Sequence, residues 1–269
     1  MPALPPRAAV PAATPRGGSC ACATGRRARR FAGAAAALAL AALASPASAQ
    51  SVLDRSRAAY AALESYEDEG VVTVEQGTPG AVAVERHSFR TLYRSPRNFL
   101  LDFIKAGGGE RLVIWCDGGD FQSWWSATGV HTVHSGGRGT VAFATAVYPT
   151  SGAAYQIPPL LFPAARMYGP VAGLEEAREE GVEEVNGRRT HRISGVARGH
   201  FGSARPITIW IDAESLLVVR ILEDTPEGMP AGQIQRITTT LQPRANPELA
   251  DERFRFVPPS QHRPAGGRP

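Results

Sequence analysis

The sequence predicts a mainly β (α+β) fold, in which a single strongly curved antiparallel sheet of about ten or eleven strands carries one N-terminal helix and a short helical lid. Three observations support this prediction. Apolar and polar residues alternate through most of the chain, which is the period-two pattern of strands with one buried face. Glycine-rich turns separate these segments at short intervals, as antiparallel hairpins require. Residues 157–163 are apolar but contain three prolines, so they predict a cover over the sheet and not a central strand.

Residues 1–49 have the three-part layout of a secretory signal peptide. Arginines at positions 26, 27, 29 and 30 precede an apolar segment at 31–43, and Ala47-Ser48-Ala49 forms a small-residue cleavage site. A membrane anchor is the alternative, but it needs roughly 20 apolar residues, more than this segment offers. The usual spacing after a twin-arginine pair is missing. We therefore expect export, removal of residues 1–49, and a domain over 50–259 without stable membrane insertion, followed by a disordered tail at 260–269.

The signal peptide carries the basic character of the chain. The whole sequence has a net charge of +4, but residues 1–49 contain six arginines and no acidic residue, which leaves a net charge of about −2 on the remainder. The remainder therefore has no basic patch of the kind that would indicate nucleic-acid binding. Cys116 is the one cysteine beyond residue 49, so no internal disulfide is predicted. It alternates with Leu112 and Ile114, which predicts a small buried hydrophobic side chain.

The first half of the domain predicts one helix, six strands and a second, shorter helix. Leu53, Tyr60 and Leu63 form a helical stripe within residues 51–65. The strands expected after this helix are at 66–76, 84–94, 99–103, 111–117, 121–126 and 129–135. Residues 140–148 are apolar and rich in alanine, which favours a short helix.

The second half predicts the lid and further hairpins. The apolar side chains expected to form the lid are Ile157, Leu160, Leu161 and Phe162. Asn186-Gly187 between two alternating segments is a strong hairpin signal. The strands expected in this half are at 175–185, 188–196, 206–212, 216–223, 233–241 and 253–257, with one helical turn at 247–251.

The alternation separates the two faces of the predicted sheet. Arg86, Arg90 and Arg94 fall on one face of their strand, which should be solvated, while Phe89 and Tyr93 fall on the other. The apolar residues expected to line the concave face as a ligand-binding wall are Phe89, Tyr93, Phe99, Leu101, Phe103, Phe121, Trp125, Ile207, Ile209, Ile211, Leu217, Val219, Ile221, Phe254 and Phe256. A two-sheet sandwich is the alternative for so many strands, but the apolar cover and the helix favour one curved sheet around a pocket.

No catalytic residue, metal or cofactor is predicted. His131 and His134 have a metal-like spacing on a helix, but on a strand residues three apart face opposite sides. No cluster of cysteines or carboxylates supports a metal site, and the glutamates at 175–184 are typical of a solvated face. No nucleophile-elbow or phosphate-loop motif occurs. A hydrolase would require Ser, His and Asp side chains that converge in one pocket.

Five segments occur in the order and spacing of a known group. They are residues 60–76, 89–103 with Pro96, 113–125 around Asp117-Gly118, 207–222 and 254–259. In this respect the chain resembles the periplasmic lipoprotein-carrier superfamily (LolA/LolB-like), and within it the predicted periplasmic proteins that are outer-membrane lipoprotein-sorting-like. The resemblance implies a half-open β-barrel of about eleven strands, helices that act as a lid, and a cavity for acyl chains.

The chain departs from this group at one position. The carriers have an arginine directly before the proline that corresponds to Pro96, and that arginine takes part in lid movement; here the residue is Ser95, flanked by Arg94 and Arg97 as lid-coupling candidates. The leading hypothesis is a non-catalytic periplasmic carrier for a lipidated or hydrophobic ligand. Its expected partners are lipid or lipoprotein acyl chains and an inner- or outer-membrane protein. The alternative is a periplasmic sensor or scaffold that binds a protein and whose sheet is filled by its own side chains.

Overall fold

One antiparallel sheet dominates the computed structural model, which describes residues 51–136, 139–198 and 204–259. Its 12 strands are β1 (Ser65–Thr78), β2 (Ala81–Arg94), β3 (Asn98–Ile104), β4 (Arg111–Asp117), β5 (Phe121–Trp125), β6 (Val130–His134), β7 (Glu175–Val185), β8 (Arg188–Arg198), β9 (Ala204–Asp212), β10 (Val218–Glu223), β11 (Ile234–Leu241) and β12 (Arg244–Ala245). The strand order is β6-β5-β4-β3-β2-β1-β11-β10-β9-β8-β7, with β12 paired to β1. The expected signal peptide and C-terminal tail lie outside the described residues.

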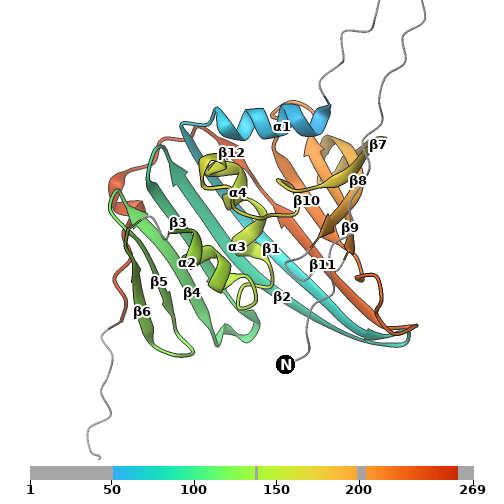
Figure 1. The fold of residues 1–269 in the computed structure, drawn as a ribbon, viewed down its shortest axis with the longest axis horizontal. Coiled ribbons are helices and arrows are strands. Elements are labelled where there is room, and N and C mark those ends of the chain that lie inside the picture. Colours follow the sequence, from blue (N-terminus) through green and yellow to red (C-terminus); the bar gives the residue numbers. More distant parts are fainter. Residues whose placement is uncertain (1–50, 137–138, 199–203, 260–269) are drawn as a thin grey trace, which may run out of the picture. The chain divides into compact units, whose positions relative to one another are not determined.

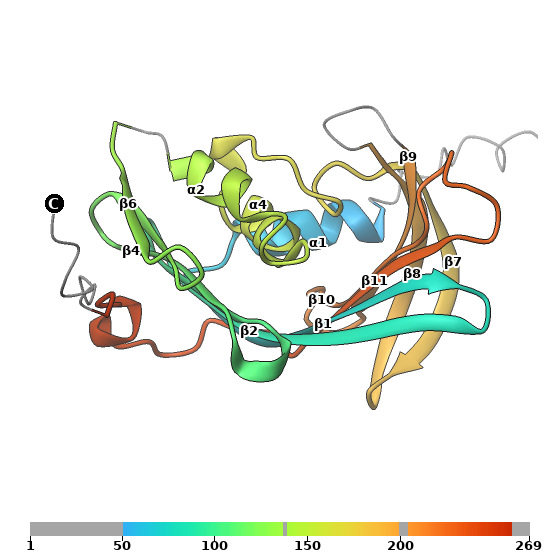
Figure 2. The same cartoon turned by 90° about the horizontal axis from the view of Figure 1, so that it is seen from below.

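The α-helices are short and lie on the concave side of the sheet. They are α1 (Val52–Ala61), α2 (Gly139–Ala146), α3 (Ala153–Gln156) and α4 (Pro158–Leu161). The described residues also form the 3₁₀ helices η1 (Ala106–Gly108), η2 (Pro163–Ala165) and η3 (Asp251–Phe254), of which η3 lies against the convex side. Figure 1 shows α2, α3 and α4 across the middle of the sheet, and Figure 2 shows the sheet as a trough that holds α1, α2 and α4. The end strands β6 and β7 do not pair with each other, so the sheet stays open. The predicted mainly β fold with a curved, half-open sheet is confirmed.

Every strand predicted between residues 66 and 241 is present, as is the short helix after β6. Asn186 and Gly187 both have positive φ, 52° and 74°, as a type I′ hairpin turn requires. This turn pairs Val185 with Arg188 and fixes the register of β7 on β8. The N-terminal helix is shorter than predicted: the Ser51 side chain caps it by accepting a hydrogen bond from the Asp54 N–H, but it ends at Ala61 because Ser65 already belongs to β1.

The concave core joins the lid to one half of the sheet. The rings of Phe99 on β3 and Phe121 on β5 meet Phe143 on α2 and Phe162 after α4, with ring centroids 5.2–6.1 Å apart. The lid residues predicted from the proline-containing segment pack into the same core. Aromatic pairs at such distances stabilise a contact beyond their buried area, so this cluster fixes the lid over β3–β5.

Glycine is required where Phe89 packs. Gly70 on β1 pairs directly with Phe89 on β2. A Cβ atom at Gly70 would lie 2.2 Å from the Cζ atom of the Phe89 ring, far inside van der Waals contact. The ring therefore lies over the glycine of the neighbouring strand.

A second apolar cluster lies on the convex face, and it corrects one prediction. Phe254 is fully buried against Leu92, Leu100, Val113, Trp115 and Trp124, and Phe256 packs at its edge. Residues 253–257 are therefore not a strand, and neither phenylalanine belongs to the concave wall. The cause is that β3 and β4 are buried on both faces, so that their apolar residues demand an outer cover as well as an inner one. The C-terminal segment around η3 supplies it, displaced from the helical turn predicted at 247–251.

Simple alternation also assigns Val219 to the wrong face of the sheet, the concave one. The pairing of β10 with β9 shifts register between Val218 and Arg220. This irregularity turns Val218 into the concave core, while Val219 joins Val185 and Trp210 on the convex face. A bulge reverses which face later side chains occupy, and nothing in the local residue pattern marks it.

Candidate functional site

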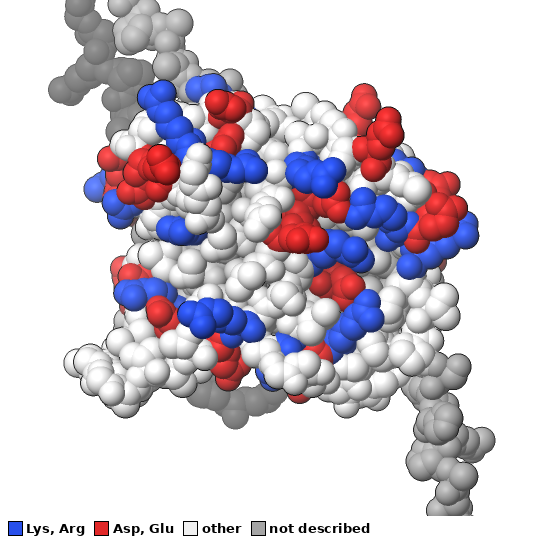
Figure 3. Space-filling model, turned by 180° about the vertical axis from the view of Figure 1, so that it is seen from behind, with Lys and Arg blue, Asp and Glu red and all other residues white. Residues whose placement is uncertain are grey.

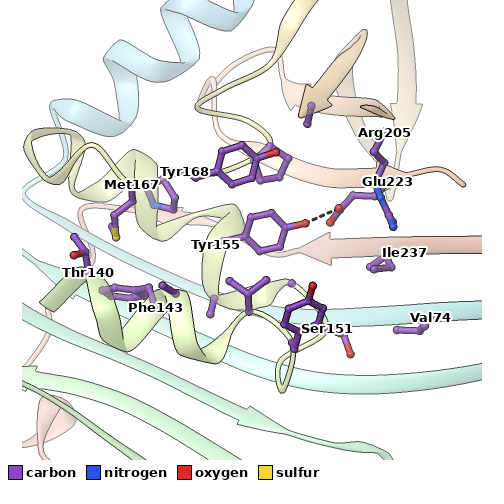
Figure 4. A pocket seen from close by; sticks show the side chains of 18 of the residues that line it. Val74, Thr140, Phe143, Ser151, Tyr155, Met167, Tyr168, Arg205, Glu223 and Ile237 are labelled. Carbon is purple, nitrogen blue, oxygen red and sulfur yellow. Dashed lines mark hydrogen bonds between the residues drawn. The ribbon is translucent and has the colours of Figure 1, made fainter. Parts of the chain in front are cut away.

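A groove of about 690 Å³ lies between the lid and the part of the sheet made by β1, β11, β10 and β9 (Figure 4). The sheet contributes Val74 and Ile237, and the lid contributes Phe143 on α2 and Met167 after η2. Most of the other lining residues are small or apolar, among them Ala144, Val147, Ala154, Pro159, Pro170 and Ala197. The groove is therefore a largely apolar cavity, bounded by the lid on one side and the sheet on the other.

The predicted ligand-binding wall does not line this groove. Phe99, Leu101 and Phe103 are almost completely buried, as are Ile207, Ile209 and the other inward-facing isoleucines. The lid residues Ile157, Leu160 and Leu161 are buried in the same core. The concave face therefore has the predicted apolar wall, but the side chains of the lid and of α1 fill the space in front of it.

The sequence did mark the residues that line the groove, although only weakly. Arg205 lies two residues before Ile207 and Glu223 two residues after Ile221, so that alternation places both charged side chains on the concave face. The same alternation continues from Val72 to Val74 on β1. The sequence feature that could have indicated the groove is a charged residue near the end of a strand, at a position where alternation places the side chain on the apolar face.

Glu223 is a buried carboxylate at one end of the groove (Figure 4). Its carboxylate accepts hydrogen bonds from the Tyr155 hydroxyl at 2.6 Å and from the Gln156 side-chain amide at 3.0 Å. Burial raises the pKa of Glu223, although both donors and the nearby Arg205 oppose the shift. Burial, with the neighbouring Glu223 charge, also raises the pKa of the Tyr155 hydroxyl. The ring of Tyr155 stacks on Tyr168, with centroids 6.1 Å apart.

Arg205 lies at the same end of the groove. Its Nη2 atom donates to the side-chain oxygen of Gln235 at 2.9 Å. Its Nη1 atom is buried and has no hydrogen-bond acceptor among the described residues. The described contacts include no ion pair between Arg205 and Glu223 within 4.0 Å, so the guanidinium keeps an unmet donor.

A further buried carboxyl lies away from the groove, beneath α1. Asp68 on β1 accepts hydrogen bonds from the Tyr66 hydroxyl at 2.7 Å and from the Thr91 N–H at 3.1 Å. Burial raises the pKa of Asp68 to about 7, against the effect of these donors. Tyr60 of α1 links this region to β10, because its hydroxyl accepts the Val218 N–H at 3.1 Å.

The lid-coupling candidates do not reach the lid. Arg94 donates to the Leu249 carbonyl and to Asp251, and its guanidinium lies over the Phe254 ring on the convex face. Arg94 therefore anchors the C-terminal segment. Arg97 is exposed on the turn between β2 and β3.

The described histidines form no metal cluster. His131 stacks on Trp115 on the convex face, while the ring of His134 lies 2.9 Å from the Ser123 hydroxyl, on the same face as Phe121. The two histidines thus face opposite sides, as predicted. No group of three potential metal ligands occurs among the described residues. The Ser123–His134 pair does not line the groove, and no carboxylate among the described contacts orients this histidine.

The remaining expectations concern surface and core. Cys116 is buried, as predicted, and burial raises the pKa of its thiol. Strand β7, with its many glutamates, is exposed along almost its whole length. Figure 3 shows basic and acidic side chains interleaved over the outer face, without a large patch of one sign. Among the described residues, no helix has the length and apolar character needed to cross a membrane.

The chain is similar to one protein family and to several solved structures. A family model described as "Predicted periplasmic protein (DUF2092)" matches residues 49–265. The lipoprotein LppX of Mycobacterium tuberculosis is 15% identical, with a TM-score of 0.39, over 74% of this chain and 97% of LppX. The LolA superfamily protein NE2245 of Nitrosomonas europaea is 11% identical, with a TM-score of 0.29, over 77% and 97%. The structure of the Pseudomonas aeruginosa MucA/MucB complex contains a chain that is 16% identical, with a TM-score of 0.41, over 77% and 60%. No curated protein matches.

Proposed function

Since the chain belongs to the DUF2092 family of predicted periplasmic proteins, we propose that it is a non-catalytic periplasmic carrier or binding protein for hydrophobic, acyl-bearing ligands. The observation that supports this proposal is the groove between lid and sheet. Its volume of about 690 Å³ is within the range of about 300–1,000 Å³ that is typical of small-molecule sites. Its apolar lining with a few polar groups at one end is also typical of such sites.

The proposal differs from the sequence-based hypothesis in where the ligand lies. The wall made by Phe99, Leu101 and Phe103 is covered by the protein's own lid. The ligand therefore contacts Val74 and Ile237 of the sheet and the inner surface of α2.

Acyl burial alone can supply useful affinity. Each buried methylene contributes about 0.8 kcal/mol, so eight buried methylenes contribute roughly 6 kcal/mol. Before the entropic cost of binding, this corresponds to a Kd in the range of tens of micromolar. No covalent step is required, and release needs only a competing apolar surface.

The filled centre of the concave face favours a second function, a module that binds a protein partner. Ile157, Leu160 and Leu161 pack against the wall, so the wall is covered without a lipid. In that case the groove would accept an apolar side chain or peptide segment of a partner, and a lipid-extracted sample would bind no acyl probe.

Blocking the groove tests the carrier proposal. Ala144 lines the groove from an exposed position on α2, so Ala144→Trp should fill it without disturbing the core. Thr145→Trp on the same helix is the matched control, because Thr145 does not line the groove. Delipidated protein should bind a pyrene-labelled acyl probe, and the first variant should weaken binding about tenfold or more while the control does not.

A second pair of variants tests the sheet side of the groove. Val74→Asp places a charge in the groove, whereas Val71→Asp places one at an exposed position of the same strand. Mass spectrometry of lipids extracted from natively purified protein would identify the ligand. If the probe binds all four variants equally, or does not bind the wild-type protein, the groove is not an acyl site.

A further inference from the structure

The charged residues of the groove are at one end of it. Figure 4 shows Arg205 and Glu223 at one end of the groove, and Met167, Phe143 and Thr140 at the other. Among its described lining residues, Arg205 and Glu223 are the only charged side chains. A ligand without a polar group would make no polar contact with these two side chains. Their position at one end of the groove therefore bears on which ligands the groove prefers.

The two charged side chains differ in how well they are satisfied. The Glu223 carboxylate already accepts hydrogen bonds from Tyr155 and Gln156, one on each oxygen. Arg205 has a partner for Nη2 in Gln235, but Nη1 is buried without an acceptor among the residues that the structure describes. A buried charged donor without a partner is more costly than a buried neutral donor without one. The missing partner at this end of the groove is therefore an acceptor, and an anionic one would satisfy the guanidinium best.

The electrostatics of this end support the same conclusion. Burial raises the pKa of Glu223 and so favours its neutral form. Any protonation of Glu223 leaves the Arg205 charge less compensated. Arg205 opposes the burial-driven rise in the pKa of both Tyr155 and Glu223, as expected of a positive charge at this end of the groove. Tyr168, whose ring stacks on Tyr155, closes the aromatic side of the same end.

From this arrangement, and resting on the proposed acyl-binding function, we infer that the groove selects single-chain anionic amphiphiles. The oxyanion of the head group binds the Arg205 guanidinium, and the acyl chain extends along Phe143 toward Met167. Carboxylate and phosphate head groups share the chemistry that Arg205 recognises, because both offer two coplanar oxygens to a guanidinium.

Titration calorimetry with three ligands of one chain length tests this inference. Tridecanoate, dodecyl phosphate and dodecanol carry the same dodecyl tail, and at pH 8 only the first two are anionic. Wild-type protein should bind at least one anion about tenfold more tightly than the alcohol, as one charge-assisted hydrogen bond would give. Comparison of the two anions identifies the preferred head group.

Variants of Arg205 test whether the head group binds at this residue. Arg205→Gln should remove the preference for the anions over dodecanol, while Arg205→Lys should retain part of this preference. Arg236→Gln is the matched control, because Arg236 lies on β11 of the same sheet, does not line the groove, and interacts with Asp224 and Glu75.

The outcomes separate this inference from the proposed function. If all three ligands bind wild-type protein equally, or if Arg205→Gln weakens all three alike, the acyl groove stands and the head-group assignment is wrong. If none of the three binds, both the acyl-binding function and the head-group assignment fail. Circular dichroism of each variant establishes that the fold is retained.

Discussion

Replacing the buried carboxyl beneath α1 should change how stability depends on pH. Asp68 is completely buried on β1, and burial raises its pKa from 3.8 to about 7. The folded protein therefore binds the Asp68 proton more tightly than the unfolded chain. Linkage requires that this contribution to stability is fully present below about pH 4 and is lost as the pH rises through about 7. In Asp68→Asn the side chain is neutral at every pH, so the variant should not show this loss.

The size of the effect follows from the shift. A change of about three pKa units at about 1.36 kcal/mol per unit gives a loss of roughly 4 kcal/mol between pH 4 and pH 8. The free energy of unfolding of Asp68→Asn, relative to wild type, should rise by up to that amount over this interval. At pH 4 the variant should be equal to or less stable than wild type. The Tyr66 and Thr91 donors bond to the two different oxygens of the carboxyl, and an amide has only one oxygen.

Urea unfolding followed by tryptophan fluorescence at pH 4, 6, 7 and 8 measures the difference directly. Glu67→Gln, at the adjacent position on β1, should show the opposite sign. The hydrogen bond from Arg253 lowers the pKa of Glu67, so its contribution is present near neutral pH and is lost as the pH falls. Parallel pH profiles for wild type and Asp68→Asn would mean that Asp68 is ionised in the folded protein, and the reasoning from burial would be wrong.

Two further predictions concern packing. Gly70→Ala should destabilise the domain by about 1–3 kcal/mol, because its Cβ would overlap the Phe89 ring, whereas Gly109→Ala, where nothing lies within 4 Å, should be nearly neutral in the same urea experiment. Phe254→Ala should lower the free energy of unfolding by about 3–5 kcal/mol without changing acyl-probe binding, since Phe254 is buried on the convex face. If the variant lost affinity for the probe at unchanged stability, Phe254 would belong to the ligand site.

Local chemistry was sufficient to predict the hairpins. Asn186 and Gly187 specify a turn whose positive φ values other residues adopt only with strain, and the register of β7 and β8 follows from that turn. Similarly, the prolines of residues 157–163 exclude a central strand, and the apolar residues between them need burial, so the sequence predicts a cover. In both cases the deciding interactions are within a few residues of each other.

The faces of the strands were harder to predict wherever both faces are buried. Leu100 and Leu101 are neighbours on β3 and both are buried, one against the C-terminal segment and the other against the lid. Alternation gives the two faces of such a strand but does not tell which face meets which partner. Phe254 was assigned to the concave side for that reason, and Val219 because a register shift is not visible in the order of apolar residues.

The groove was missed for a different physical reason. A charged residue near the end of a strand is normally solvated, and by that rule Arg205 and Glu223 would be surface residues. Glu223 is buried because Tyr155 and Gln156, which precede it by 68 and 67 residues, bring α3 over the end of β10. Burying a carboxyl is costly unless donors surround it, and these two donors reduce the cost. Among the described residues, Arg205 still has one donor atom without an acceptor. A charged residue at a position where an apolar residue would pack better lowers stability, and the proposed specificity for an anionic ligand would offset this cost by supplying a partner for Arg205.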